Sequence, residues 1–266
     1  YYKDIYIEEE DSLELQQKQR SAVSGKVNIA VVLLRHLSNF TDFNRLERDE
    51  RVNLYYTNNT EEISKADIVI MPGTKSTLDD LLELRRNGVA EAVVRAARNG
   101  ATVIGICGGY QMMGLSVEDP EGVEGGINRL PGLGLLPVST VMQSDKVTRQ
   151  TEFRFLNPDG GICKGYEIHM GQSDITGDSD AVPLNYLQDG TTEGWRVGDK
   201  CFGTYMHGIL DNEAVVDLLL APYVKVGKGN ISDYRTFKEE QYDRLAAHVR
   251  SHLNMPLLYE ILGGND

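Results

Sequence analysis

Three short, almost purely apolar segments in the first half of the chain constrain the fold most strongly. They are VNIAVVLL (27–34), ADIVIM (66–71) and ATVIGI (101–106). Strands without polar alternation are buried on both faces, as in a parallel sheet covered by helices. Two helical patterns, Thr77 to Arg86 and Val89 to Arg98, lie between the second and third segments. Because strands alternate with helices here, we expect an α/β fold with a mostly parallel central sheet flanked by helices.

The second half of the chain has a different pattern, in which strand-like segments follow one another with turn signals between them. The expected strands are 132–142, 147–157, 163–175, 193–200 and 201–210. Short connections of this kind join antiparallel strands, so we expect an antiparallel extension of the sheet. We also expect Asp211 to cap a helix that runs to Leu220, and a last amphipathic helix from about Thr236 to Leu253 before Pro256.

The N-terminal segment differs in composition from the rest of the chain. Residues 1–25 are polar and rich in charge, whereas the apolar segments start at Val27. We therefore expect residues 1–25 to be a linker or the tail of a missing upstream domain. Residues 26–266 are expected to form one domain with a helical C-terminal tail.

The composition excludes several classes of function. The 266 residues include 40 acidic and 27 basic ones, for a net charge of −13, so a nucleic-acid partner is not expected. No apolar run approaches the roughly 20 residues that cross a bilayer. The three cysteines form no C-x-x-C pair, which argues against a disulfide framework and a zinc site. We expect a cytoplasmic protein with free thiols, no metal site and no membrane partner.

The stretch ATVIGICGGYQMMG (101–114) is the most informative one for chemistry. An apolar strand runs into Gly-Ile-Cys-Gly-Gly and a helix begins at once, which is the arrangement of a nucleophile elbow with Cys107 as the nucleophile. Gly105 and Gly109 remove side chains that would clash in so sharp a turn. At the helix N-terminus the dipole stabilises a thiolate, and the N–H of Gly108 is placed to stabilise an oxyanion.

A cysteine in a Gly-rich turn can also be a small buried packing residue. For Cys107, the strand before it, the helix after it and its place at the carboxyl end of a strand favour the nucleophile. Cys163 and Cys201 lie in antiparallel strand patterns without such a turn. We expect these two cysteines to have packing roles.

A cysteine nucleophile usually requires a base, and the chain has five histidines. We favour His207, which ends a strand pattern before Gly208 and would be held on a rigid strand yet exposed at its edge. His169 lies mid-strand near Glu167, and alternation puts both on one face. There the carboxylate could orient an imidazole or meet a substrate, or the two could form a purely structural polar pair. The remaining histidines are expected in a loop or on the last helix: His36, His248 and His252.

The loop MPGTKST (71–77) follows the second buried strand. The N–H of Gly73 could point toward Cys107 and act as a second oxyanion donor. The loop lacks the G-x-x-x-x-G-K spacing of a phosphate-binding loop, so we do not expect it to bind a nucleotide.

Several segments together resemble one known family. In chain order they are LSNFTDF (37–43), MPGTKST (71–77), GICGGYQ (105–111), GYEIHMG (165–171) and GTYMHG (203–208). They resemble the glutamine amidotransferase domain of cobyric acid synthases, in the class I amidotransferase-like group, over about residues 27–222. Their order is more specific than the elbow motif, which all class I amidotransferases share.

The resemblance implies a reaction for this domain. Cys107 attacks the side-chain amide of glutamine, His207 shuttles the proton, and a glutamyl thioester forms while ammonia leaves. The resemblance also implies that Gly73 and Gly108 stabilise the oxyanion and that Gln111 helps to hold the glutamine. No cofactor is implied for the domain itself.

For the complete family protein, the resemblance implies an N-terminal synthase domain in the same chain, to which residues 1–25 would lead. That domain would use ammonia, ATP and magnesium to amidate the b, d, e and g carboxylates of a corrinoid, adenosylcobyrinic acid a,c-diamide. The chain alone should therefore not complete the ligase reaction.

One position departs from most class I enzymes, in which a Glu two residues after the histidine completes a triad. Here that position is Ile209, as is usual in the cobyric acid synthase group. A Cys–His dyad, or Glu167 as a substitute, must therefore be considered. Without an orienting group, His207 is hypothesised to be a poorer base until the synthase domain docks.

Three other functions are kept as alternatives. One is the amidotransferase part of a related ligase, which amidates the a and c carboxylates of cobyrinic acid or the cell-wall precursor lipid II. Another is a cysteine peptidase or hydrolase on the same scaffold. The third is a docking or regulatory domain that has kept the fold without the activity.

Overall fold

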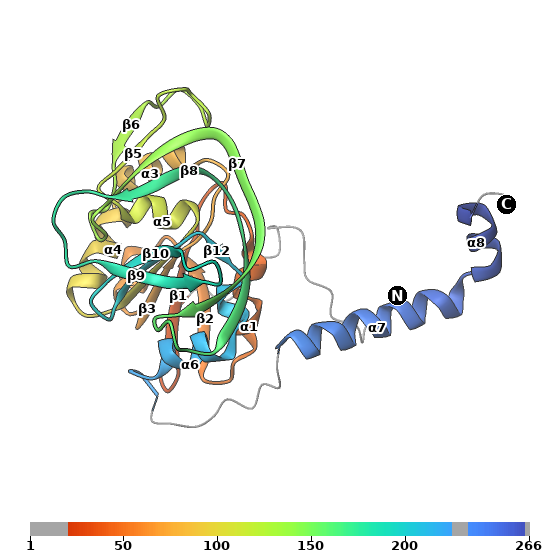
Figure 1. Ribbon diagram of the computed structural model, residues 1–266. Coiled ribbons are helices and arrows are strands. Elements are labelled where there is room, and N and C mark those ends of the chain that lie inside the picture. Colours follow the sequence, from red (N-terminus) through yellow and green to blue (C-terminus); the bar gives the residue numbers. More distant parts are fainter. Residues whose placement is uncertain (1–20, 225–233, 264–266) are drawn as a thin grey trace.

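The computed structural model describes residues 21–224 and 234–263 of the chain (Figure 1). Most of the predicted linker, residues 1–20, lies outside the described residues. Just before the first strand, the backbone N–H of Ala22 donates to the carboxylate of Glu62 at 2.9 Å. The chain is therefore already in contact with the folded domain at this point.

A parallel sheet forms the centre of the molecule, as the apolar segments predict. Its strands lie in the order β11 (Cys201–Thr204), β4 (Thr102–Ile106), β3 (Ile68–Met71), β1 (Val27–Val32) and β2 (Val52–Thr57), each parallel to its neighbours. Every residue of β3 and β4 is buried, which explains their continuous apolar sequences. The apolar side chains of these strands belong to one continuous buried cluster.

Helices connect and flank the parallel strands (Figure 1). α3 (Thr77–Arg86) and α4 (Val89–Arg98) have the bounds that the sequence predicts. Gly88 separates them in a left-handed conformation with φ 80°, which ends one helix before the next begins. The other helices of this half are α1 (Asn44–Arg48), α2 (Thr60–Ser64) and α5 (Gly108–Met113).

The antiparallel extension is confirmed, and its main element is a long two-stranded ribbon. β7 (Val138–Phe155) pairs antiparallel with β8 (Ile162–Ile175), and the pair arches around one side of the molecule (Figure 1). Two short antiparallel strands, β9 (Val182–Leu187) and β10 (Thr192–Val197), connect this ribbon to β11. The other small strands are β5 (Ser116–Glu118), β6 (Arg129–Pro131) and β12 (Met206–His207).

The two predicted strands 132–142 and 147–157 both overlap the single strand β7, which begins only at Val138 and ends at Phe155. The segment between them, 143–146, is polar and exposed, which gives the sequence the pattern of a turn. In the structure it is a bulge, where the register shifts between Val141 and Lys146 and the pairing with β8 then resumes.

The prediction that Asp211 caps the following helix is wrong by one residue. Asp211 ends a short 3-10 helix that begins at Ile209, and Asn212 is the residue before α6 (Glu213–Leu220). Asp and Asn are both favoured before helices, so the sequence alone does not separate these neighbours.

The C-terminal tail contains two helices. α7 (Tyr234–His252) corresponds to the predicted last helix, and α8 (Met255–Gly263) follows it. Pro256 was expected to lie beyond the last helix, but it lies in the first turn of α8, where the missing N–H is tolerated. No helix of the described residues is long and apolar enough to cross a membrane.

Candidate active site

Cys107 lies between β4 and α5, at the carboxyl end of a buried parallel strand. Its backbone has φ 52° and ψ −113°, a positive φ that residues with a side chain rarely adopt. The Cys107 N–H donates to the carbonyl of Thr204 at 2.8 Å, and its own carbonyl accepts from the N–H of Gln111 at 3.1 Å. The predicted sharp turn into a helix is therefore present.

Glycines around Cys107 allow other parts of the backbone to come close. A Cβ at Gly109 would lie 1.9 Å from the carbonyl oxygen of Met71, and one at Gly105 would lie 2.7 Å from the backbone N of Tyr110. Neither distance leaves room for a side chain, so only glycine fits. The prediction that these two glycines remove clashes is confirmed.

His207 is fully buried. The sequence analysis expected it to be exposed at a strand edge, and this prediction is wrong. β12 pairs with β8, which covers the strand, and the ring of Tyr166 stacks on the imidazole with centroids 5.2 Å apart. The Nδ1 atom of His207 lies 2.7 Å from Oδ2 of Asp42. The other oxygen of this carboxylate accepts the backbone N–H of Gly208 at 2.9 Å.

The charges around His207 favour its protonated form. Burial of the ring would by itself lower the pKa of His207. The charge of Asp42 and its hydrogen bond to the ring, together with a hydrogen bond and a charge interaction with Cys107, outweigh burial and raise the pKa to about 10.

Asn39 is a second side chain at the imidazole. Its Nδ2 atom lies 3.1 Å from Nδ1 and 3.0 Å from Nε2 of His207. Asn39 has φ 52° and precedes the 3-10 helix Phe40–Phe43, which carries Asp42. Asn39 and Asp42 therefore reach the histidine from one short turn after β1.

Glu167 and His169 lie on one face of β8, as strand alternation predicts. Nε2 of His169 lies 3.3 Å from the Glu167 carboxylate, and Nδ1 lies 3.1 Å from the carbonyl of Gly171. Glu167 also binds Arg149 at 2.8 Å. The His169 ring stacks on Tyr205 with centroids 3.7 Å apart. Burial acts to raise the pKa of Glu167, but the hydrogen bonds and charges of His169 and Arg149 lower it.

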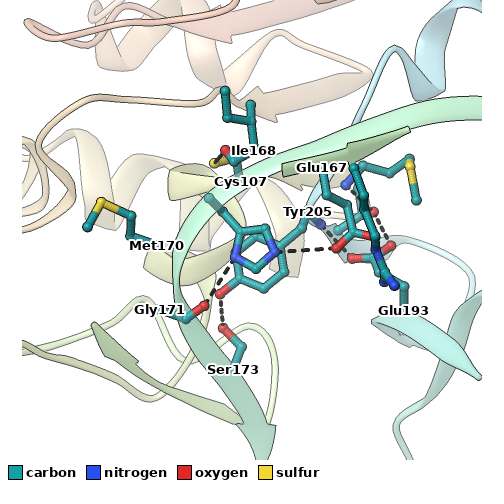
Figure 2. A network of polar contacts seen from close by, with 12 residues as sticks. Cys107, Glu167, Ile168, Met170, Gly171, Ser173, Glu193 and Tyr205 are labelled. Carbon is teal, nitrogen blue, oxygen red and sulfur yellow. Dashed lines mark hydrogen bonds and ion pairs between the residues drawn. The ribbon is translucent and has the colours of Figure 1, made fainter. Parts of the chain in front are cut away.

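Gln111 is buried, and its side-chain amide binds protein groups. Its Nε2 donates to the carbonyl of Met170 at 2.9 Å and to the hydroxyl of Tyr205 at 3.2 Å, while Oε1 accepts from Thr77 at 3.0 Å. Both N–H groups of the amide therefore have partners. The sulfur of Cys107 lies 3.6 Å from the carbonyl oxygen of Ile168, on the same stretch of β8 (Figure 2).

Some of these side chains line a cavity of about 390 Å³, whereas His207, Asp42 and Glu167 are not among its lining residues. Of the predicted site residues, Cys107, Gly108, Gln111 and His169 line it. Gly73 lies next to the cavity wall, since it precedes Thr74 and a Cβ there would be 3.3 Å from Oγ of Ser38; the same Cβ would be 3.3 Å from Cε1 of His207. The nucleophile and a space for a small substrate thus occur together at the carboxyl ends of parallel strands, where α/β folds bind ligands.

Comparison with known proteins gives the family. Residues 28–215 match the family described as the CobB/CobQ-like glutamine amidotransferase domain. The chain belongs to this family. The resemblance found in the sequence is therefore confirmed over most of the described residues.

Two curated relatives of this amidotransferase domain are similar along the whole chain. The cobyric acid synthase of Phocaeicola vulgatus is 66% identical over 267 residues, which is 100% of this chain and 54% of that protein. The cobyric acid synthase of Bacteroides fragilis is 65% identical over 266 residues, with the same shares covered. The chain thus spans about half the length of the curated relatives that it matches.

Solved structures support the fold of the amidotransferase domain. The PurLQS structure from Thermotoga maritima has a TM-score of 0.56 and 17% sequence identity, and it covers 75% of this chain and 100% of that chain. At this identity the likeness concerns the fold alone.

The group that contacts His207 in this amidotransferase is one that the sequence analysis missed. Asp42 occupies Nδ1 of the ring, whereas the alternative, Glu167, has Arg149 and His169 as its partners. The sequence analysis left a Cys–His dyad and Glu167 open, whereas the structure places Asp42 against His207. Asp42 lies in the LSNFTDF segment, but only the folded sheet brings this turn against β12.

Cys163, Cys201, His36, His248 and His252 are not among the residues that line the cavity of this amidotransferase. Cys163 is buried in β8 and Cys201 begins β11. His36 lies in a loop and binds Asp80 at 2.9 Å, and α7 carries His248 and His252. Among the described residues, no group of three or more His, Cys, Asp or Glu side chains could hold a metal ion.

Proposed function

We propose that this domain hydrolyses glutamine through a thioester on Cys107 and thereby supplies ammonia to a synthase. One observation carries the proposal. A cysteine with positive φ at the end of a parallel strand interacts electrostatically with a buried histidine, and Nδ1 of that histidine lies 2.7 Å from a carboxylate. This is the combination of nucleophile, base and orienting group that acyl transfer requires.

In the proposed reaction, Cys107 and His207 start as a thiolate and an imidazolium, which the raised pKa of His207 favours. The sulfur attacks the carboxamide carbon of glutamine and forms a tetrahedral adduct. His207 then gives its proton to the nitrogen, which leaves as ammonia while the thioester remains. A water molecule, deprotonated by His207, attacks the thioester, and glutamate and the free thiolate are regenerated.

The other site residues have supporting roles in this proposal. The N–H groups of Gly108, at the start of α5, and of Gly73, beside His207, would stabilise the oxyanion. Gln111 would act indirectly, since its amide already binds Met170 and Tyr205 and so fixes the cavity wall. His169 and Glu167 would fix the opposite stretch of β8.

We also propose that the ammonia serves a cobyric acid synthase reaction in cobalamin biosynthesis. The names and the identity of the relatives support this, as does the fact that the chain spans only about half their length. In that reaction a synthase domain would use ATP and magnesium to amidate the b, d, e and g carboxylates of the corrinoid. Three free cysteines fit a reducing cytoplasm as its location.

The test uses Cys107→Ala in the full-length protein. We expect glutamine-dependent amidation of the corrinoid to be lost and amidation with added ammonia to continue. Loss of both activities would contradict a separate glutaminase site. Hydrolysis of peptides without hydrolysis of glutamine would favour the cysteine hydrolase alternative. Absence of a covalent adduct between Cys107 and a glutamine-like electrophile would favour the non-enzymatic one.

A further inference from the structure

One buried carboxylate has no part in the proposed reaction. Glu193 of β10 is buried, and three groups donate hydrogen bonds to it. They are the backbone N–H of Tyr205 at 2.6 Å (Figure 2), the hydroxyl of Thr204 at 2.6 Å and the side-chain amide of Asn185 at 2.7 Å. Burial raises the pKa of Glu193, while these three hydrogen bonds lower it. Because all three partners donate, the surroundings are suited to the charged form.

Glu193 lies where the chain changes its partner strand. β11 ends at Thr204 beside β4, and β12 begins at Met206 beside β8, so Tyr205 alone separates the two strands. Buried backbone N–H groups require acceptors. The N–H of Tyr205 donates to Glu193, and the N–H of Met206 donates at 2.9 Å to the Thr204 hydroxyl. That hydroxyl donates in turn to Glu193. One carboxylate therefore holds both N–H groups, one directly and one through a hydroxyl.

This short stretch of backbone connects the nucleophile to the base. The carbonyl of Thr204 accepts the N–H of Cys107 at 2.8 Å and so fixes the backbone of the nucleophile. His207 lies three residues after Thr204, in β12. Asp42 contacts the ring of His207, whereas Glu193 holds the backbone that carries this ring. The position of His207 relative to Cys107 therefore depends on the backbone that Glu193 holds.

The strands around Glu193 fix where its carboxylate lies. Glu193 is paired with Asn185 of β9, whose amide is one of the three donors. The next residue, Gly194, has φ 69°, and a Cβ there would clash with the carbonyl oxygen of Gly203 in β11. β10 can therefore come this close to β11 only because residue 194 is a glycine. The close approach brings Glu193 to the end of β11, where Thr204 and Tyr205 lie.

We propose that Glu193 is a positioning residue for the reaction, because its carboxylate holds the backbone that sets the distance from the Cys107 sulfur to the His207 imidazole. The inference rests on the proposed function, since it takes Cys107 as the nucleophile and His207 as the base. Without the charge, the N–H of Tyr205 loses its acceptor and the backbone around it relaxes. A displacement of about 1 Å at a reacting group can lower a rate by about 100-fold.

The side chain of Tyr205 is the alternative positioning group and must be weighed. Its hydroxyl lies 3.2 Å from Nε2 of Gln111 and 2.7 Å from the hydroxyl of Ser173, and its ring stacks on His169. These contacts hold the side chain, whereas Glu193 holds the backbone N–H of the same residue. Tyr205→Phe removes the hydroxyl and leaves this N–H in place, so it separates the two possibilities.

The test measures glutamine hydrolysis by the intact protein with Glu193→Gln, which keeps the shape of the side chain and removes its charge. We expect kcat to fall about 10- to 100-fold and KM to stay within about 3-fold, because the reacting groups move apart while the cavity is kept.

A second measurement is the rate at which iodoacetamide alkylates Cys107 at neutral pH. The sulfur–carbon bond forms as iodide leaves, and mass spectrometry of the Cys107 peptide gives the rate. The thiolate is the reacting form, and a nearby imidazolium stabilises it. Glu193→Gln should therefore slow alkylation about 3- to 10-fold. A merely looser structure would expose the sulfur and have the opposite effect, so the sign of the change separates the two roles.

Asp49→Asn is the matched control. Asp49 is a buried carboxylate that also accepts a backbone N–H, that of Arg51 at 3.0 Å, and it is not among the residues that line the cavity. Both variants should lower the melting temperature by roughly 3–12 °C, because in each a buried donor loses a charged acceptor. Only Glu193→Gln should lower kcat and slow the alkylation of Cys107.

Thr204→Val carries the same test if Glu193→Gln does not fold. It keeps the carboxylate of Glu193 and removes the hydroxyl that accepts the N–H of Met206. We expect kcat to fall about 3- to 30-fold and alkylation of Cys107 to slow. An unchanged kcat in a folded Thr204→Val would contradict the proposal.

Three results would overturn the proposal. In the first, Glu193→Gln has the lower melting temperature of Asp49→Asn but keeps kcat and the alkylation rate within about 2-fold, which means a structural role. In the second, kcat falls while alkylation becomes faster. In the third, Tyr205→Phe has the full effect and Glu193→Gln has none. If the unmodified protein does not hydrolyse glutamine, the proposed function fails instead, and the alkylation rates still test Glu193 by themselves.

Discussion

The carboxylate of Asp42 lies 2.7 Å from Nδ1 of His207, although 165 residues separate the two in the chain. Both side chains are buried, and the second carboxylate oxygen accepts the N–H of Gly208. One carboxylate thus fixes the imidazole and the backbone that follows it. Nδ1 of the ring thus contacts Asp42, while the amide nitrogen of Asn39 lies 3.0 Å from Nε2.

Replacing Asp42 should weaken the base and change its pKa. In Asp42→Asn the charge that raises the pKa of His207 is lost, while the shape of the side chain is kept. We expect kcat for glutamine hydrolysis to fall about 10- to 1000-fold, with a smaller change in KM. The alkaline limb of the pH–rate profile should move to lower pH, because the imidazolium loses its proton earlier. Steady-state kinetics across pH would measure both effects.

The comparison variant for this prediction is Glu167→Gln, which removes the carboxylate that the sequence offered as the alternative. Glu167 contacts His169 and Arg149, so its loss should lower activity less and leave the alkaline limb in place. If Glu167→Gln moves the alkaline limb and Asp42→Asn does not, then Asp42 is not the group that sets the pKa of His207.

Folding stability should also depend on His207. Its folded-state pKa is about 10 and its ordinary value is 6.5, so folding favours the protonated ring. This contribution is complete below pH 6.5 and is lost as the pH rises toward 10. We expect the free energy of unfolding to fall by about 2–4 kcal/mol over this interval. In Asp42→Asn the fall should be much smaller. Urea titrations at several pH values would measure it, and parallel curves for the two proteins would contradict the assignment.

Patterns within one segment predicted the elbow and most of the fold. Apolar runs identify β1, β3 and β4, because a strand buried on both faces has no polar alternation. The glycines around Cys107 indicate a crowded turn without any knowledge of the partner strand. The bounds of α3 and α4 follow from their own periodicity and from Gly88 between them.

Contacts between distant segments were not predictable in the same way. The pairing of Asp42 with His207 depends on how the turn after β1 meets β12, and no local periodicity encodes that distance. The burial of His207 has the same origin, because β8 covers an edge that looks free in the sequence. The bulge in β7 could not be told from a turn in the sequence, because both consist of a short polar segment between apolar ones.

The turn around Cys107 should be intolerant of even one methyl group. A Cβ at Gly109 would lie 1.9 Å from the backbone oxygen of Met71, which cannot move without disrupting β3. Gly109→Ala should therefore lower the free energy of unfolding by about 3 kcal/mol or more, or prevent folding. Gly126→Ala is the matched control, since a Cβ there meets nothing within 4 Å. Thermal unfolding of both variants is the measurement, and equal melting temperatures would contradict the crowded elbow.

Asp80 should position two loops of the site at once. It is buried at the start of α3, and its carboxylate binds Nδ1 of His36 at 2.9 Å and the hydroxyl of Thr74. These loops carry Asn39 on one side and Gly73 on the other, and backbone hydrogen bonds join them, such as that from Ser38 to Gly73 at 3.0 Å.

Removing this carboxylate should loosen the site while the sheet stays folded. We expect Asp80→Ala to lower stability by about 1–3 kcal/mol, since the hydroxyl and the imidazole lose a shared acceptor. It should also reduce kcat for glutamine hydrolysis more than it raises KM, because the loop that carries Gly73 is then less well placed. Asp79→Ala, at an exposed neighbour that binds only Ser76, is the control. If both variants have the same kcat, the two loops do not depend on Asp80 for their position.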